Sequence, residues 1–180
     1  MPADAHKREV SGTEAREMVL SDMHLKNLVI RGSFEMSASQ ADNWEWQKEI
    51  VIENCIVEDL QIPMFHAAKP VVFLNSDFKK IDLYAPYFLS GLLVKNCLFE
   101  TVVDFQSGGH NKNGTEFRLE GNVFKEFVNF FDDWFEGPVV VKDNKFEKGT
   151  NLLSTTQMVT FDVAPEISGN SGEINIEGEN

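Results

Sequence analysis

The chain of 180 residues has few basic residues and no long hydrophobic run. Only 16 Lys and Arg stand against 29 Asp and Glu, which gives a formal net charge of −13 at pH 7. A protein that binds nucleic acid through phosphate contacts needs a basic face, so this balance argues against that class, and equally against a protein that binds anionic membranes. No apolar run approaches the roughly 18 residues of a membrane span. With 42% hydrophobic residues, the composition is that of a globular chain.

Motifs that hold metals, nucleotides or catalytic nucleophiles are also missing. The two Cys residues form no Cys-x-x-Cys motif, and no Gly-x-Ser-x-Gly sequence is present. Gly108 and Gly109 lack the further fixed residues of a dinucleotide or phosphate loop. The four histidines share no ligand spacing: His6, His24, His66 and His110. We therefore predict no cofactor and no metal site.

The two ends of the chain differ from its middle. Residues 1–9 contain no apolar signal segment, which indicates a cytoplasmic protein if residue 1 is the native start, and a secreted or cell-envelope protein if a leader was removed. The sequence Ser11-Gly12-Thr13-Glu14 resembles a capping box and predicts a helix over 13–20 within an N-terminal segment 1–24. No Lys or Arg follows Lys148, and we expect residues 177–180 to form an acidic, solvated tail.

A repeat occupies the middle of the chain. An apolar–polar–apolar triplet recurs at intervals of 21–26 residues, which is too regular for chance. Its copies begin at Phe34, Leu60, Ile81, Val103, Val128, Thr150 and Ile174. A second column starts strand-like segments with period-2 alternation at Ile50, Val71, Leu92, Phe117 and Val139. A third column is rich in Phe: Val57, Phe78, Phe99, Phe124 and Phe146.

The repeat interval of 21–26 residues indicates the architecture. Segments of about 22 residues that hold two or three short strands cannot bury a core alone, but stacked coils pair each strand with the next coil about 4.8 Å away. Helical repeats are excluded by the strand composition, and the fixed Leu pattern of leucine-rich repeats is absent. We predict an all-β protein with a parallel β-helix of about six or seven coils over residues 25–176. The 15 Phe against two Tyr fit a dry interior, where a phenol hydroxyl has no partner.

The coils resemble right-handed parallel β-helices, and pentapeptide-repeat-like proteins in particular. Ser76-Asp77-Phe78-Lys79-Lys80 and Ile81-Asp82-Leu83-Tyr84-Ala85 are similar to two successive five-residue units centred on Phe78 and Leu83. The other coils are longer and irregular, so the family motif covers about ten residues. The resemblance implies the fold; its members have varied functions, and some resemble DNA and bind topoisomerases.

Two polar columns are predicted to be structural. Asn54, Asn75 and Asn96 recur every 21 residues, and Asn122, Asn144 and Asn170 fall within a residue of the same column, which favours an asparagine ladder at a coil corner over a recognition row. Cys55 and Cys97 lie two coils apart in one column, roughly 9–10 Å, which is too far for a disulfide. We expect free thiols.

Two candidate sites remain. Asp82 and Asp104 are outward triplet residues one coil apart, near 5 Å, close to the carboxylate separation of a retaining glycosidase, although a solvated face is the simpler interpretation. The stretch 129–137 is the densest in aromatic and acidic residues. Its members that could bind a carbohydrate or a cation are Asp132, Asp133, Trp134 and Glu136, unless they only turn a corner. Trp44 and Trp46, in an insertion at 37–47, are expected to cover the side or end of the solenoid.

Three classes of function follow. The foremost is a non-catalytic scaffold or protein-interaction protein, because the informative columns build ladders. The alternative is a carbohydrate-active enzyme or carbohydrate-binding module that uses Asp82, Asp104 and Trp134. The third is a small-molecule or metal binder at Asp132 and Asp133. The expected partner is another protein or a glycan, and the oligomeric state stays open.

Overall fold

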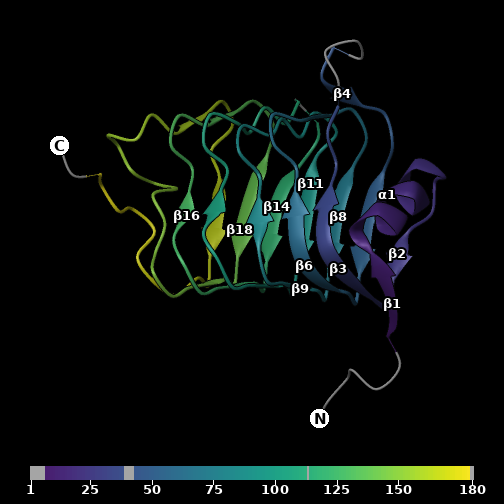
Figure 1. Cartoon of the computed structure of the whole chain (residues 1–180). Helices are drawn as coiled ribbons and strands as arrows, with labels where there is room; N and C mark the ends of the chain where they lie inside the picture. The colour runs from purple at the N-terminus through teal and green to yellow at the C-terminus, as the bar shows by residue number, and fades with distance from the viewer. Residues whose placement is uncertain (1–6, 39–42, 113, 179–180) are drawn as a thin grey trace.

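The protein is a parallel β-solenoid of about seven turns with one short helix near its N-terminus (Figure 1). The computed structural model describes residues 7–38, 43–112 and 114–178. His6 and part of the 37–47 insertion are among the remaining residues. The interpretation of His6 therefore lies outside the described ranges, and that of the insertion lies partly outside them. Within these ranges, no helix has the length and apolar character that crossing a membrane requires.

Two long parallel sheets form the walls of the solenoid. In the first, consecutive coils contribute β1 (Arg8–Ser11), β3 (Leu28–Glu35), β6 (Ile56–Gln61), β9 (Asp77–Phe78), β12 (Leu98–Phe99), β15 (Val123–Phe124) and β19 (Lys145–Phe146), and β10 (Ile81–Asp82) also pairs with β6. In the second they contribute β2 (Leu25–Lys26), β5 (Ile50–Glu53), β8 (Val71–Leu74), β11 (Leu92–Lys95), β14 (Phe117–Glu120), β18 (Val139–Lys142) and β21 (Glu166–Ser168).

Shorter pairs complete the coils. They are β4 (Glu45–Trp46) with β7 (His66–Ala67), β13 (Val103–Asp104) with β16 (Val128–Asn129), and β17 (Trp134–Phe135) with β20 (Thr160–Phe161). Every pairing is between coils and parallel, so equivalent residues of successive coils lie side by side.

The predicted columns are confirmed by the strand register. Each segment of the second predicted column begins a strand, and Ile50, Val71, Leu92, Phe117 and Val139 pair in that order. The triplet column runs through Phe34, Leu60 and Ile81, and again through Val103, Val128 and Thr150. The seventh copy, at Ile174, is partly buried and lies in no strand.

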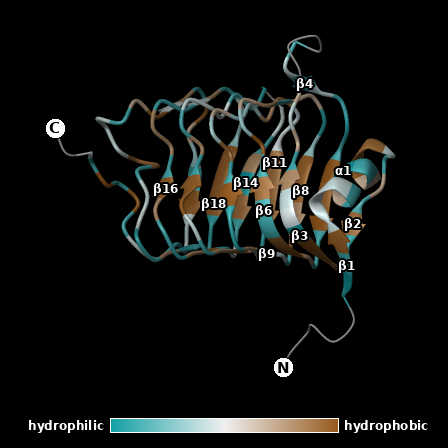
Figure 2. Ribbon diagram, viewed as in Figure 1, coloured by the Kyte–Doolittle hydropathy of each residue, from teal (hydrophilic) through white to brown (hydrophobic). Residues whose placement is uncertain are grey.

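Phenylalanine fills the interior that these columns enclose. The strands of the walls are largely coloured as hydrophobic in Figure 2. Twelve of the 15 Phe are buried. Phe78, Phe99, Phe124 and Phe146 form a stack of nearly parallel rings with centroids 4.9–5.1 Å apart, the spacing of successive coils. Both tyrosines lie outside this stack, and Tyr84 is 42% exposed. A dry core without phenol groups is therefore confirmed.

The helix α1 (Gly12–Leu20) covers the first coil (Figure 1). It begins one residue before the predicted start. Ser11 caps it by accepting a hydrogen bond from the Glu14 backbone N–H at 3.1 Å, while Ala15 and Val19 turn into the core. The strand β1, which precedes the helix and pairs with β3, was not expected from the sequence.

Two smaller predictions have clear outcomes. Cys55 and Cys97 are free and buried, as expected, and burial raises the pKa of the Cys97 thiol to about 12. Trp46 is buried in β4, with its ring centroid 5.6 Å from that of Phe65, and thus adds to the core, whereas Trp44 is exposed.

Candidate functional site

A row of aromatic side chains runs along one corner of the solenoid. Backbone bridges align Glu45 with His66, His66 with Tyr87, Tyr87 with Gly109, and Gly109 with Trp134. Each of these positions comes shortly after the buried triplet of its coil, where the backbone turns outward. The same repeat that builds the core therefore places one residue per coil in a single external row.

The rings of this row contact one another. His66 and Tyr87 are stacked with centroids 4.4 Å apart and planes 5° apart, and the His110 ring lies 4.1 Å from Tyr87 and 5.4 Å from Trp134. Gly109 has a φ of +87°, and a Cβ on it would lie 2.7 Å from the Trp134 carbonyl oxygen. Because no side chain fits there, His110, the next residue, fills the gap in the row.

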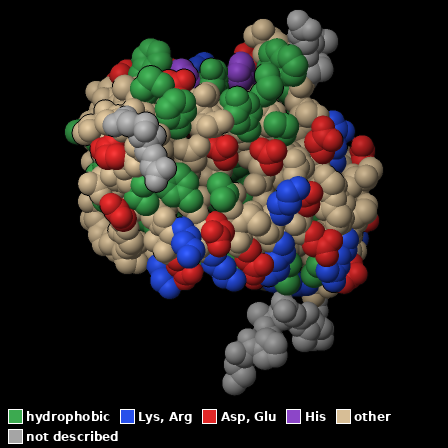
Figure 3. Space-filling view, turned by 60° about the vertical axis from the view of Figure 1, so that its left-hand side comes forward, with side chains coloured by type: hydrophobic (Ala, Val, Ile, Leu, Met, Phe, Trp, Pro, Cys, Tyr) green, Lys and Arg blue, Asp and Glu red, His purple; other side chains and the backbone are tan. Residues whose placement is uncertain are grey.

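Exposed apolar side chains flank the row. Met64, Tyr84, Trp134 and Met158 are 53%, 42%, 47% and 54% exposed. They belong to four turns of this corner, and the turn with Gln106 and Ser107 lies between those of Tyr84 and Trp134. We call His66, Tyr87, His110, Trp134, Met64, Tyr84 and Met158 the aromatic edge. Figure 3 shows hydrophobic side chains and histidines gathered along the upper border of the molecule, whereas charged side chains gather along the lower border.

The charge of the aromatic edge is negative. Its six segments (44–47, 63–68, 84–90, 106–111, 131–137 and 157–163) contain no Lys or Arg. The carboxylates of Glu136 and Asp162 contact the row directly, since Glu136 lies 3.2 Å from His110 Nδ1 and Asp162 accepts a hydrogen bond from Trp134 Nε1 at 2.9 Å. Burial lowers the pKa of His66, which keeps its ring neutral at pH 7.

The opposite edge carries balanced ion pairs. Lys79 and Lys125 both contact Glu100, at 2.8 and 3.3 Å, and Arg31 bridges Glu9 and Glu58 at 2.6 Å each. We call these residues the ionic edge. Each cation there already has an anionic neighbour, so this edge offers a partner little unpaired charge.

The four residues predicted in the stretch 129–137 do not share one surface. Trp134 and Asp132 are exposed, and Glu136 is half-buried beside His110. Asp133 is only 1% exposed: its Oδ1 accepts a hydrogen bond from the Gly108 N–H at 2.8 Å, and its Oδ2 has no partner among the described residues. Burial raises the pKa of Asp133 well above its usual range. Asp133 therefore cannot join its neighbours in a surface ligand set.

Asp82 and Asp104 border a shallow, open depression of about 440 Å³ that Lys80, Thr101 and Val102 complete. Both carboxylates already cap turns. Asp82 Oδ1 accepts from the Tyr84 N–H at 3.1 Å, and Asp104 Oδ1 accepts from the Gln106 N–H at 3.2 Å and from Asn129 Nδ2 at 2.9 Å. These bonds give both residues a structural role in the turns where they lie.

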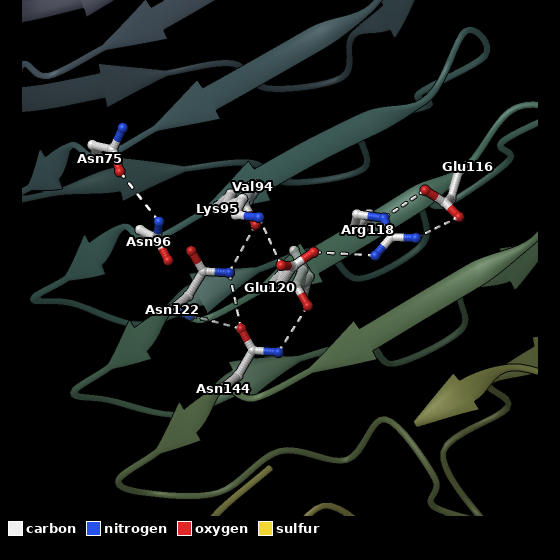
Figure 4. A network of polar contacts seen from close by, with 10 residues as sticks. Asn75, Val94, Lys95, Asn96, Glu116, Arg118, Glu120, Asn122 and Asn144 are labelled. Carbon is white, nitrogen blue, oxygen red and sulfur yellow. Dashed lines mark hydrogen bonds and ion pairs between the residues drawn. The ribbon is translucent and has the colours of Figure 1, made fainter. Parts of the chain in front are cut away.

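The predicted asparagine ladder is confirmed, but it occupies two adjacent columns (Figure 4). In the exposed column, Asn96 Nδ2 donates to Asn75 Oδ1 at 3.3 Å, and these residues adopt positive φ. In the buried column, Asn144 Oδ1 accepts from the backbone N–H and from Nδ2 of Asn122, at 3.0 and 2.9 Å. These hydrogen bonds between coils give the asparagine ladder a structural role at this corner.

Sequence reasoning missed the aromatic edge except for Trp134. A signal was present, since His66, Tyr87, His110 and Trp134 recur at intervals of 21, 23 and 24 residues, which is the period of the repeat. The residue types differ along the row, and a search for identical residues does not find it.

The fold and surface define a class: a parallel β-solenoid with an aromatic, acidic edge opposite an ionic one. Among the described residues, no group of three or more His, Cys, Asp or Glu is placed to hold a metal ion. No protein-family model, no curated protein and no solved structure matches the chain.

Proposed function

We propose that the protein is a non-catalytic solenoid scaffold that binds another protein through its aromatic edge. The observation that carries the proposal is the exposure of Trp134, Tyr84, Met64 and Met158 on one corner. Aromatic residues and Met are enriched at protein interfaces, and a contiguous exposed apolar patch usually marks an interaction site. Parallel backbone bridges between coils fix the spacing of the row, and a preordered surface has a lower entropic cost of binding.

The charge and the exposed apolar side chains of the aromatic edge indicate the kind of partner that fits it. Carboxylates flank the apolar side chains, and the six segments that form the edge contain no Lys or Arg. A complementary partner presents Lys or Arg together with apolar side chains, because its cations pair with Glu136 and Asp162 and lie over the exposed Trp134 ring. We therefore assign the edge to a basic, amphipathic polypeptide segment.

The ring geometry disfavours a glycan. Carbohydrate stacking needs the open face of an aromatic ring, but His66 and His110 cover the two faces of Tyr87. Trp134 is the one ring of the row that is more than a third exposed. The depression beside Asp82 and Asp104 is the feature that favours the carbohydrate alternative, and the experiment below separates the two functions.

The test uses a fluorescein-labelled 12-residue peptide of alternating Arg and Leu, its counterpart with Glu in place of Arg, and oligomers of glucose and galacturonic acid. We expect the basic peptide alone to bind, with an affinity that falls as salt rises. Trp134→Ala with Tyr84→Ala should weaken binding by at least about tenfold. Met23→Ala with Val102→Ala removes exposed apolar residues elsewhere and should leave binding unchanged.

Two results would reject the proposal. One is equal loss of binding in the two double variants, which would indicate non-specific adsorption. The other is glycan binding that Asp82→Asn with Asp104→Asn abolishes, which would support the carbohydrate alternative instead.

We also propose that the coils are right-handed and related to pentapeptide-repeat proteins. Phe78 and Leu83, the centres of the two five-residue units, are both buried, as is Ser76 at the start of the first unit. A crystal structure with experimental phases would test the hand of the coils directly.

A further inference from the structure

Next to the last segment of the aromatic edge, five hydrogen-bond donors converge on one carboxylate. The turn Ser154-Thr155-Thr156 surrounds Glu177. The Thr155 N–H donates to Oε1 at 3.0 Å and the Thr156 N–H donates to Oε2 at 3.1 Å. The Ser154 and Thr156 hydroxyls donate to Oε2, and the Thr155 hydroxyl donates to Oε1 at 3.2 Å. A carboxylate offers about four lone-pair sites, so these donors saturate it.

The turn holds this arrangement by itself. Ser154 is 5% exposed, and its Oγ accepts hydrogen bonds from the N–H groups of Thr156 and Gln157 at 3.3 and 3.2 Å. Because these bonds occupy the lone pairs of Ser154 Oγ, its proton is directed outward to the carboxylate. Hydrogen bonds within residues 154–157 therefore help to hold the Ser154 hydroxyl and the Thr156 N–H in place beside Glu177.

The donors are neutral, and no Lys or Arg follows Lys148 in the sequence. A receptor of N–H and O–H groups without a cation suits a singly charged carboxylate better than a doubly charged phosphate. The hydrogen bonds from Ser154, Thr156 and Thr155 lower the pKa of Glu177 to about 2, so the carboxylate is ionised under ordinary conditions.

We propose that the Ser154–Thr156 turn is a carboxylate-binding site that Glu177 fills from within the chain, and that an external carboxylate binds there when Glu177 is withdrawn. In the native chain Glu177 competes at the high effective concentration of a tethered group. A ligand that displaces it must therefore present a carboxylate, from a chain terminus or an acidic side chain, together with further contacts.

The experiment is a rescue of Glu177→Ala by sodium acetate, with sodium chloride at equal ionic strength as the reference. We expect the variant to melt below the native protein at pH 7. Acetate should raise its Tm by roughly 3–5 °C at ten times the acetate dissociation constant, and should shift the Thr155 and Thr156 amide resonances. Sodium phosphate should have a smaller effect, and the native protein should not respond to acetate.

Glu173→Ala is the matched control, because Glu173 is an exposed acid of the same segment with no side-chain hydrogen bond among the described residues. It should lose no stability and gain none from acetate. Adding Ser154→Ala to Glu177→Ala should abolish the rescue. The proposal is overturned if acetate leaves the two amide resonances of Glu177→Ala unmoved, or if the rescue persists without Ser154. Neither outcome involves the basic peptide, so failure of this proposal is distinguishable from failure of the proposed function.

Discussion

At the scale of single residues, Asp133 has the least ordinary environment. It is buried at a corner where the corresponding residue of the preceding coil is Gly108, and only one of its oxygens has a hydrogen-bond partner among the described residues. Burial removes the water that would solvate an ionised carboxylate at this position, and no cation among the described residues offsets the effect of burial on its pKa. The neutral acid is therefore favoured. Folding stability therefore depends on the protonation of this residue.

We expect the free energy of unfolding to fall as pH rises because of Asp133. Its pKa is raised in the folded state, so its contribution is fully present below the unfolded pKa of about 3.9 and is lost as pH rises toward the folded pKa, with a slope of up to about 1.4 kcal/mol per pH unit. Asp133→Asn should remove this slope. Urea unfolding between pH 4 and pH 8 measures it, with Asp132→Asn at the exposed neighbour as the control. Parallel profiles for the native protein and Asp133→Asn would refute this.

At the scale of elements, each corner of a coil is held by hydrogen bonds to the next coil. The buried asparagine column shows this best. Asn144 receives two bonds from Asn122, and its own Nδ2 donates to the Leu119 carbonyl oxygen at 2.9 Å. The exposed column links fewer coils by side-chain hydrogen bonds. In the coil after Asn96, the equivalent position is Gly121, which also has a positive φ but no side chain.

Asn144→Ala should therefore destabilise the protein by about 1–3 kcal/mol, because it leaves the buried backbone N–H of Asn122 without its partner. Asn96→Gly should cost less than about 1 kcal/mol, since glycine tolerates the positive φ and the lost bond is exposed. Chemical denaturation of both variants measures the difference. Similar losses for the two substitutions would contradict a ladder in which only the buried column carries the stability.

The sequence repeat made the stacked coils and their interior columns predictable. Phe78, Phe99 and Phe124 must recur because parallel pairing brings equivalent residues together, and any other register would break the stack. The strand β1 was not predicted because Arg8–Ser11 contains a single apolar residue, Val10, and so shows no alternation. The burial of Asp133 escaped because an acid in a polar turn is normally solvated. The aromatic edge was not predicted because its fourth coil has Gly109 at the aligned position. The ring in that coil belongs to His110, the next residue, so the spacing along the sequence is irregular.

At the scale of the whole molecule, the two long edges of the solenoid differ. On the ionic edge, exposed pairs such as Lys79 with Glu100 satisfy each other and contribute little to stability. On the aromatic edge, Glu136 and Asp162 contact the rings of His110 and Trp134, and Lys48, Lys69 and Lys112 directly follow three of its six segments. The two edges therefore differ in kind, since ion pairs cover one and exposed apolar side chains gather on the other (Figure 3).

Mapping where the basic peptide binds tests the central claim most directly. Amide resonances of the isotope-labelled protein are followed as the alternating Arg–Leu peptide is added. The account predicts that the largest changes fall on the turns around Met64, Tyr84, His110, Trp134 and Met158, and that the ionic edge around Lys79 and Lys125 does not respond. Changes centred on the ionic edge or around Asp82 and Asp104, or no saturable change at all, would contradict it.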